Sequence, residues 1–332
     1  MGIVGNTPLN SRFSTLANNF FHLTFIPAIN LLTKRFSMEK ISVTAVLKRT
    51  IILTATLTCL MTTVFGQTKT AYALVNGIKM YYEIHGIGKP IVLLHGAFNT
   101  INMAFAQLIP ELSKTRQVIA VELQGHGRTQ DIDRPFSFES MADDVAALLK
   151  FLKTDSADIF GYSMGGGVAQ QLAIRYPQLV RRLIITSSVY KYEGWSPETR
   201  AILPILTPEM FESTPIKQEY DKLAPDPKHW KEFITKMKKF VTTSYDFGAD
   251  KIKAIKSPTL IIIGDGDGVL PEHAVDMYRL RGGSYMVDFG PIHAAQLAIL
   301  PGTSHISVMM QTQWVLSMVV PFLDASLQQA KH

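Results

Sequence analysis

Short apolar runs bounded by turn-forming residues recur along the chain and predict alternating strands and helices. A hairpin of strands 72–75 and 79–84 is expected first, because Asn76-Gly77 is a favoured tight turn. Mostly apolar runs, typical of strands buried on both faces, then lie near Ile91, Val118, Asp158, Leu183, Leu260 and Leu297. Helical spacing of apolar residues separates these runs, over 101–112, 138–152, 164–176, 272–280 and 311–327. This alternation predicts an α/β fold with a mostly parallel central sheet and helices on both faces.

One long segment, residues 190–255, breaks the alternation. It contains helix-like pieces, one of them opened by Pro197 in the first turn, but no convincing buried strand. We interpret this segment as a helical cap inserted into an α/β core made of residues 67–189 and 256–332. Residues 1–66 form a separate N-terminal extension in this interpretation.

The charge of the chain is unevenly distributed. Of the net charge of +6, the first 66 residues contribute six basic residues against one acidic, and the remainder holds 27 basic against 26 acidic. A nearly neutral remainder carries no electrostatic footprint for nucleic acid. We therefore expect a small-molecule partner and no nucleic acid.

The N-terminal extension, residues 1–66, has the layout of a secretory signal peptide. A basic pair precedes the uncharged stretch 50–68, and small residues flank a candidate cleavage site before Gln67. Met38 would give a leader of usual length, so we expect an exported protein, periplasmic or extracellular, with no stable membrane partner after cleavage. The alternative is a retained membrane anchor over 50–68. Cys59, the only cysteine, lies in this leader, which excludes disulfides and cysteine-based metal sites from the processed chain.

A candidate nucleophile lies in the motif Gly161-Tyr162-Ser163-Met164-Gly165. The motif stands between a predicted strand and a predicted helix, which is the setting of a nucleophile elbow. Such a turn exposes the serine hydroxyl, and the two glycines let strand and helix pass close to it. The motif alone is weak evidence, so its partners decide its meaning.

Candidate partners for Ser163 follow in the chain. Asp265 and Asp267 come directly after the strand 259–263, and His305 follows the last predicted strand. The order serine, acid, histidine is that of the α/β-hydrolases. Because the two aspartates are two residues apart, either carboxylate is a candidate acid. Clustered carboxylates also allow a metal site, but without nearby His or Cys ligands we expect neither metal nor cofactor.

In combination, these motifs resemble the α/β-hydrolase-fold serine hydrolases, over roughly residues 70 to 328, and in particular an esterase, lactonase or haloperoxidase-like branch. The resemblance favours Asp267 as the acid, because the second aspartate of a Gly-Asp-x-Asp pattern is usually catalytic in that family. It also implies that the backbone N–H groups of Ala97 and Met164 stabilise an oxyanion. Candidate substrate-binding residues are Phe98, Tyr162 and Trp230. Further apolar cap residues that are available either to line an acyl pocket or simply to pack the cap are Met210, Phe211, Phe233 and Phe240.

The predicted activity is hydrolysis of a carboxylic ester or related acyl compound through an acyl-serine intermediate. The same three residues on this fold also serve C–C bond hydrolases, lactonases and cofactor-free haloperoxidases or perhydrolases, because cap and loops select the substrate. A second class is a non-catalytic ligand-binding protein on the same scaffold. All three catalytic positions are filled here, which favours an enzyme.

Overall fold

The computed structural model describes residues 68–288 and 293–326. The predicted leader, its candidate cleavage site and Cys59 lie outside these ranges. Within them, no helix is both long enough and apolar enough to cross a membrane.

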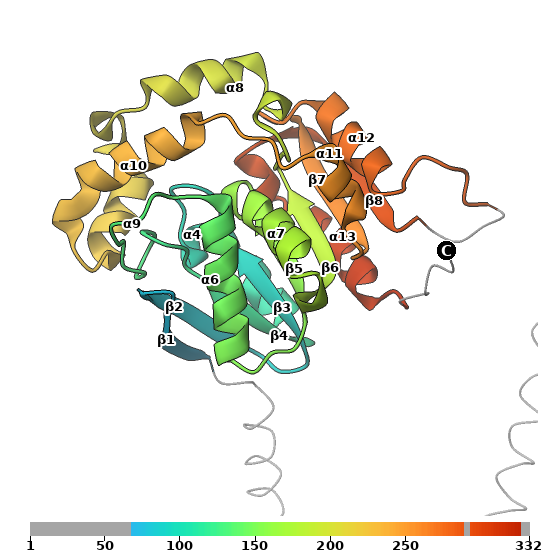
Figure 1. The fold of residues 1–332 in the computed structure, drawn as a ribbon, viewed down its shortest axis with the longest axis horizontal. Coiled ribbons are helices and arrows are strands. Elements are labelled where there is room, and N and C mark those ends of the chain that lie inside the picture. Colours follow the sequence, from blue (N-terminus) through green and yellow to red (C-terminus); the bar gives the residue numbers. More distant parts are fainter. Residues whose placement is uncertain (1–67, 289–292, 327–332) are drawn as a thin grey trace, which may run out of the picture. The chain divides into compact units, whose positions relative to one another are not determined.

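Eight strands form one sheet in the order β1-β2-β4-β3-β5-β6-β7-β8 (Figure 1). The strands are β1 Lys69–Val75, β2 Ile78–His85, β3 Lys89–Leu94, β4 Arg116–Val121, β5 Ala157–Tyr162, β6 Val180–Thr186, β7 Thr259–Gly266 and β8 Ala295–Ser304. β2 runs antiparallel to both of its neighbours, and all other neighbouring strands are parallel. The predicted hairpin is confirmed, with Asn76 and Gly77 both at positive φ, 46° and 84°. The mostly parallel sheet is confirmed as well.

Helices cover both faces of this sheet (Figure 1). They are α4 Ile101–Phe105, α5 Leu108–Leu112, α6 Phe138–Phe151, α7 Met164–Arg175, α12 Pro271–Leu280 and α13 Thr312–Asp324. Alternate residues of β3 point to opposite faces. Val92 and Leu94 pack in one buried cluster with residues of α6 and α7. Ile91 and Leu93 pack in a second cluster, with residues of α4, α5 and α13.

The single helix expected over 101–112 is two helices, α4 and α5. Pro110 accounts for the break, since it has no N–H to donate to the carbonyl of Ala106 and its ring crowds that carbonyl. As the third residue of α5, Pro110 stands in a first turn, where proline is tolerated.

The segment between β6 and β7 is helical. It contains α8 Pro197–Ile202, α9 Pro215–Leu223, α10 Trp230–Thr242 and α11 Ala249–Ala254, all within the expected cap boundaries of 190 and 255. α8 begins as its sequence predicts, because the Ser196 side chain accepts the N–H of Thr199 and Pro197 follows. In Figure 1, α8, α9 and α10 lie together on one side of the core. The division into core and cap as separate domains stays a prediction.

Candidate active site

Ser163 occupies a sharp turn between β5 and α7. Its backbone has φ 53° and ψ −116°, a conformation that residues other than glycine rarely adopt. A Cβ atom on Gly165 would lie 2.1 Å from the carbonyl oxygen of Leu94, and one on Gly161 would lie 2.2 Å from that of Gly165. Both glycines of the motif are therefore required by close backbone approach, as the elbow predicts.

The structure brings Ser163, His305 and Asp267 together. The distance from Ser163 Oγ to His305 Nε2 is 2.9 Å, and that from His305 Nδ1 to Asp267 Oδ1 is 2.8 Å. Because Asp267 is an acceptor, Nδ1 carries the proton and the lone pair of Nε2 faces the serine hydroxyl. The three residues follow β5, β8 and β7, at the carboxyl ends of parallel strands, where ligands bind in such sheets.

The side chain of Asp267 is fully buried and accepts further hydrogen bonds. Its Oδ2 lies 2.5 Å from Ser187 Oγ, and its Oδ1 accepts the N–H of Val269 at 3.1 Å. Burial works against ionisation, but the hydrogen bond and charge of His305, followed by the bond from Ser187, outweigh it and hold the pKa of Asp267 below its usual value. Asp267 is therefore a carboxylate at neutral pH and balances positive charge on His305.

Asp265 has a different environment. Its carboxylate is exposed to solvent, and Oδ1 accepts the N–H of Thr303 at 3.1 Å. Backbone hydrogen bonds from Gly302 and then Thr303 lower the pKa of this carboxyl group. Asp265 thus holds the turn before His305, while Asp267 contacts the imidazole. Within the described ranges, no group of three His, Cys, Asp or Glu side chains is placed to hold a metal ion.

The expected oxyanion donors lie beside the nucleophile. A Cβ atom on Gly96 would lie 3.2 Å from Ser163 Cβ, so the loop that carries Ala97 approaches the serine closely. Met164 is the first residue of α7, and its N–H has no acceptor within the helix. Among the described residues, neither the Ala97 nor the Met164 N–H has a hydrogen-bond acceptor. Both groups are available to a substrate oxygen.

The candidate substrate-binding residues lie in different surroundings. Phe98 is half-buried and stacks on Phe211 of the segment between β6 and β7, with ring centroids 5.2 Å apart. Trp230 is buried against Phe211 and Tyr220, and its Nε1–H has no partner among the described residues. These contacts connect Phe98 and Trp230 through Phe211.

Tyr162 is buried and contacts the backbone of His305. Its ring is buried, its hydroxyl donates to the carbonyl oxygen of His305 at 3.0 Å, and burial raises the pKa of that hydroxyl. Its placement therefore does not support the expected part in substrate binding. Met210, for which the sequence left open either pocket lining or cap packing, has 52% of its surface exposed.

Sequence reasoning missed two residues beside this site, Ser187 and Trp195. Ser187 directly follows β6, the strand next to β7, and adopts φ 50°. The only signal for it is its position at the carboxyl end of a predicted strand. Trp195 lies edge-on to the His305 ring, with centroids 5.6 Å apart, and forms an isolated bridge with Val269. These contacts join segments that are distant in the sequence, so no local sequence pattern predicts them.

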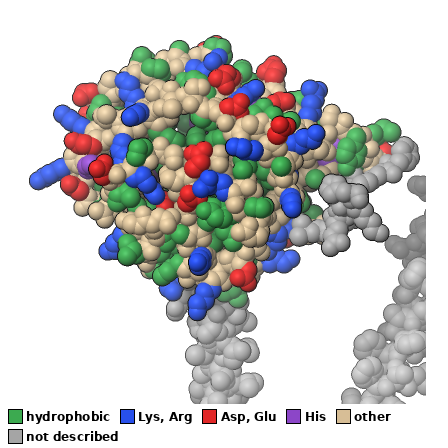
Figure 2. Space-filling view, viewed as in Figure 1, with side chains coloured by type: hydrophobic (Ala, Val, Ile, Leu, Met, Phe, Trp, Pro, Cys, Tyr) green, Lys and Arg blue, Asp and Glu red, His purple; other side chains and the backbone are tan. Residues whose placement is uncertain are grey.

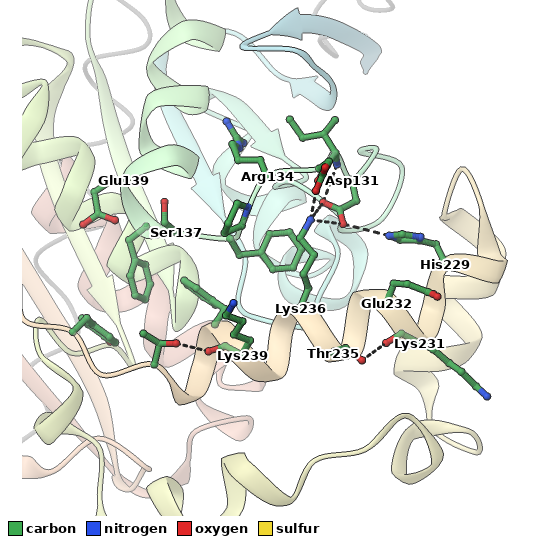
Figure 3. Close-up of a pocket in the computed structure, with 18 residues that line it drawn as sticks. Asp131, Arg134, Ser137, Glu139, His229, Lys231, Glu232, Thr235, Lys236 and Lys239 are labelled. Carbon is green, nitrogen blue, oxygen red and sulfur yellow. Dashed lines mark hydrogen bonds and ion pairs between the residues drawn. The ribbon is translucent and has the colours of Figure 1, made fainter.

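A separate groove of about 900 Å³ lies between α10 and residues 131–139, which form the loop before α6 and the first residues of α6 (Figure 3). Lys236 of α10 contacts Asp131 of the loop at 2.7 Å, and His229 approaches the same carboxylate at 3.4 Å. Phe240 lines this groove, whereas Ser163, Asp267 and His305 do not. Phe240 therefore faces the groove and not the serine.

Comparison with known sequences gives partial matches. A family model described as alpha/beta hydrolase fold matches residues 89–229. The 2-hydroxymuconate semialdehyde hydrolase of Pseudomonas sp. (strain CF600) is 35% identical over 116 residues, which cover 34% of this chain and 41% of that protein. The serine hydrolase BPHL of Mus musculus is 28% identical over 232 residues, which cover 64% of this chain and 75% of that protein. The match thus spans about two fifths of the first of these relatives.

Solved structures match over a larger part of the chain. A meta-cleavage product hydrolase from Pseudomonas fluorescens IP01 has a TM-score of 0.60 at 23% identity, covering 77% of this chain and 97% of that one. The enol-lactonase from Burkholderia xenovorans LB400 has a TM-score of 0.59 at 22% identity, covering 76% and 100%. At these identities the likeness concerns the fold. Together with the family model and the strand order, it shows that this chain has the α/β-hydrolase fold.

Proposed function

We propose that this chain is a serine hydrolase that cleaves a carboxylic ester or a related acyl compound through an acyl-serine intermediate. The observation that carries the proposal is the continuous hydrogen-bonded chain from Ser163 through His305 to buried Asp267. A serine hydroxyl is a weak nucleophile until an oriented base removes its proton, and this arrangement supplies such a base.

In the first half-reaction, Ser163 Oγ attacks the acyl carbon while His305 Nε2 takes the hydroxyl proton. The substrate carbonyl oxygen becomes an oxyanion and accepts hydrogen bonds from the Ala97 and Met164 N–H groups. When the tetrahedral intermediate collapses, the bond to the leaving group breaks and His305 returns its proton to that group. Ser163 is left acylated.

In the second half-reaction, water replaces the leaving group. His305 removes a proton from the water as its oxygen attacks the acyl carbon, and the same N–H groups stabilise the second oxyanion. Collapse releases the carboxylic acid and returns the proton to Ser163. Asp267 remains ionised throughout and keeps His305 in the required tautomer.

A second candidate is cleavage of a C–C bond next to a carbonyl, or of a lactone. It is favoured by the names of matched proteins, a semialdehyde hydrolase, a meta-cleavage product hydrolase and an enol-lactonase. The same residues would serve either reaction, with a carbon or an internal oxygen as the leaving group. Substrate choice then rests on the residues around Phe98 and Phe211.

The test is turnover of p-nitrophenyl esters from acetate to long acyl chains, with a lactone and a β-diketone assayed in parallel. Ser163→Ala and His305→Ala are compared with Ser317→Ala and His229→Ala, which change one exposed and one half-buried residue outside the site. We expect the first pair to lose turnover and the second pair to retain it. Turnover that survives in Ser163→Ala would refute the acyl-serine mechanism.

The substrates distinguish the candidate functions. A folded wild-type protein that cleaves no ester but cleaves the diketone or the lactone would support the second candidate. A folded wild-type protein that cleaves none of these substrates would favour a binding protein.

We also propose that the protein is exported and processed before Gln67. The basic pair, the uncharged stretch and the small residues before Gln67 support this proposal. Fractionation of cells that express the full chain, with N-terminal sequencing, tests it. Unprocessed protein in the membrane fraction would instead support an anchor over residues 50–68.

A further inference from the structure

We propose that His126, together with His95, is a positioning residue that orients the loop carrying the Ala97 N–H. The inference rests on the proposed function, because it assigns that N–H to oxyanion stabilisation. His126 is buried, with only 1% of the residue exposed.

Two loops leave the same edge of the sheet side by side, one after β3 and one after β4. Each loop contributes one imidazole, and each imidazole accepts a backbone N–H from the other loop. His95 Nε2 accepts the N–H of Leu123 at 3.1 Å, and His126 Nε2 accepts the N–H of Phe98 at 3.3 Å. This reciprocal pair of bonds, here called the histidine latch, joins the two loops.

The remaining ring nitrogens fix the tautomers. His95 Nδ1–H donates to the carbonyl of Gly96 at 2.8 Å, and His126 Nδ1–H donates to that of Gln124 at 2.9 Å. Each ring is therefore a donor at Nδ1 and an acceptor at Nε2. Burial lowers the pKa of His95 to about 3 and that of His126 to about 4, so both lone pairs are available at neutral pH.

The latch acts on the peptide that follows Ala97. Phe98 adopts φ 62°, an unusual conformation for a residue with a side chain, which persists only where the surroundings fix it. The hydrogen bond from the Phe98 N–H to His126 Nε2 fixes the position of Phe98. Phe98 directly follows Ala97, whose N–H is the proposed oxyanion donor. An oxyanion donor is effective only if it is oriented before the reaction.

Aromatic side chains of the segment between β6 and β7 cover the latch. Phe233 lies edge-on to the His126 ring with centroids 5.0 Å apart, and Phe211 stacks on Phe98 at 5.2 Å. This cover limits the access of water, which would compete for the Phe98 N–H. The latch therefore lies where the helical segment between β6 and β7 packs against the loops that follow β3 and β4.

The test compares His126→Phe, which keeps a ring but loses both nitrogens, with His126→Gln, whose carboxamide can reach the Phe98 N–H. His273→Phe is the matched control, because His273 is also buried and its Nε2 accepts a backbone N–H, that of Tyr190, at 3.2 Å. We expect His126→Phe to lower kcat by about 10- to 100-fold with little change in KM, less than the roughly 100- to 1,000-fold typical for loss of a whole donor. His126→Gln should recover much of kcat, and His273→Phe should retain it. Unchanged kcat in a folded His126→Phe, or no recovery with Gln, would overturn the proposal.

A second measurement is independent of turnover. Amide hydrogen exchange at Phe98 should be faster in His126→Phe than in the wild type or His273→Phe, with melting temperatures recorded for all three. If the wild type turns over no substrate, the proposed function fails. Faster exchange at Phe98 in His126→Phe than in the wild type would still support the latch. Unchanged exchange at Phe98 would refute it.

Discussion

Asp265 and Asp267 have different roles although they are two residues apart, because their carboxylates meet different neighbours. Asp267 contacts His305 and Ser187, whereas Asp265 accepts backbone N–H groups of the turn before His305. Only one of them can balance the charge that His305 acquires during acyl transfer.

We expect Asp267→Asn to lower kcat by about 10⁴-fold, because the amide favours the wrong imidazole tautomer and carries no charge. Asp265→Asn keeps an oxygen acceptor for the Thr303 N–H and should lower kcat far less. Steady-state kinetics on the best p-nitrophenyl ester measures both. An equal loss in the two variants would contradict the assignment of Asp267.

Tyr162 offers a second test at the scale of one atom. Tyr162→Phe removes only the hydroxyl that donates to the His305 carbonyl, a bond whose net contribution is on the order of 1 kcal/mol. We therefore expect kcat to fall about fivefold while KM stays unchanged. Tyr176→Phe, which removes a hydroxyl bonded to Asp143 away from the site, is the control. A rise in KM with constant kcat in Tyr162→Phe would instead indicate that the Tyr162 hydroxyl contributes to substrate binding.

At the scale of elements, the end of β8 must pass close to the end of β7 to place His305 next to Asp267. Gly264 permits this approach, since a Cβ atom there would lie 1.9 Å from the carbonyl oxygen of Thr303. At Gly266 the corresponding distance is 3.5 Å, an ordinary contact. Two glycines at the end of β7 thus face different steric limits.

Gly264→Ala should therefore destabilise the protein by about 1 to 3 kcal/mol or more, because backbone must move to relieve the clash. It should also reduce kcat, since Thr303 is two residues before His305. Gly266→Ala is expected to change both quantities little. Urea unfolding and ester turnover of the two variants give the comparison, and equal stabilities would show that β8 adjusts without cost.

The elements that the sequence predicted well are those marked by an apolar run or a regular apolar spacing of their own. All eight strands and the helix after Ser163 belong to this group. The helix α9 was not predicted, although Ile216, Tyr220 and Leu223 have helical spacing, because this apolar face is narrow and only Tyr220 of the nine residues is buried. Ser187 and His126 escaped notice for another reason, since their partners come from neighbouring strands and loops. Periodicity reports what one element buries, and it carries no information on which loops meet.

At the scale of the whole molecule, the distribution of charge bears on how stability depends on pH. On the face shown in Figure 2, basic and acidic side chains alternate without forming a large field of one sign. This agrees with the near balance of charge outside the first 66 residues. Individual buried groups, and not the net charge, should therefore govern how stability depends on pH.

We expect the free energy of unfolding to fall as the pH drops from about 6.5 toward 4. His95, His126 and His273 have pKa values lowered by burial, to about 3, 4 and 4, while the unfolded chain binds their protons near pH 6.5. Their stabilising contribution is complete above pH 6.5 and is lost on acidification. Glu122 acts in the opposite direction, because burial raises its pKa to about 7, but it is one group against three.

Urea unfolding at several pH values measures this dependence. His126→Gln should give a shallower slope between pH 6.5 and 4, because one of the three imidazoles is absent. His229→Gln, which changes a histidine whose side chain is 42% exposed, should change the slope less. A slope that is identical in all three proteins would contradict the role assigned to buried His126.

The separation of Ser163 and His305 by 142 residues has a consequence for folding. The serine lies after the fifth strand and the histidine after the eighth, so in the proposed mechanism Ser163 is not activated until the last strand has joined the sheet. In a partly folded chain, Ser163 would be unreactive even if the turn between β5 and α7 had already formed. Covalent labelling of Ser163 by a fluorophosphonate, followed in time during refolding, would therefore act as a clock for the arrival of the final strand.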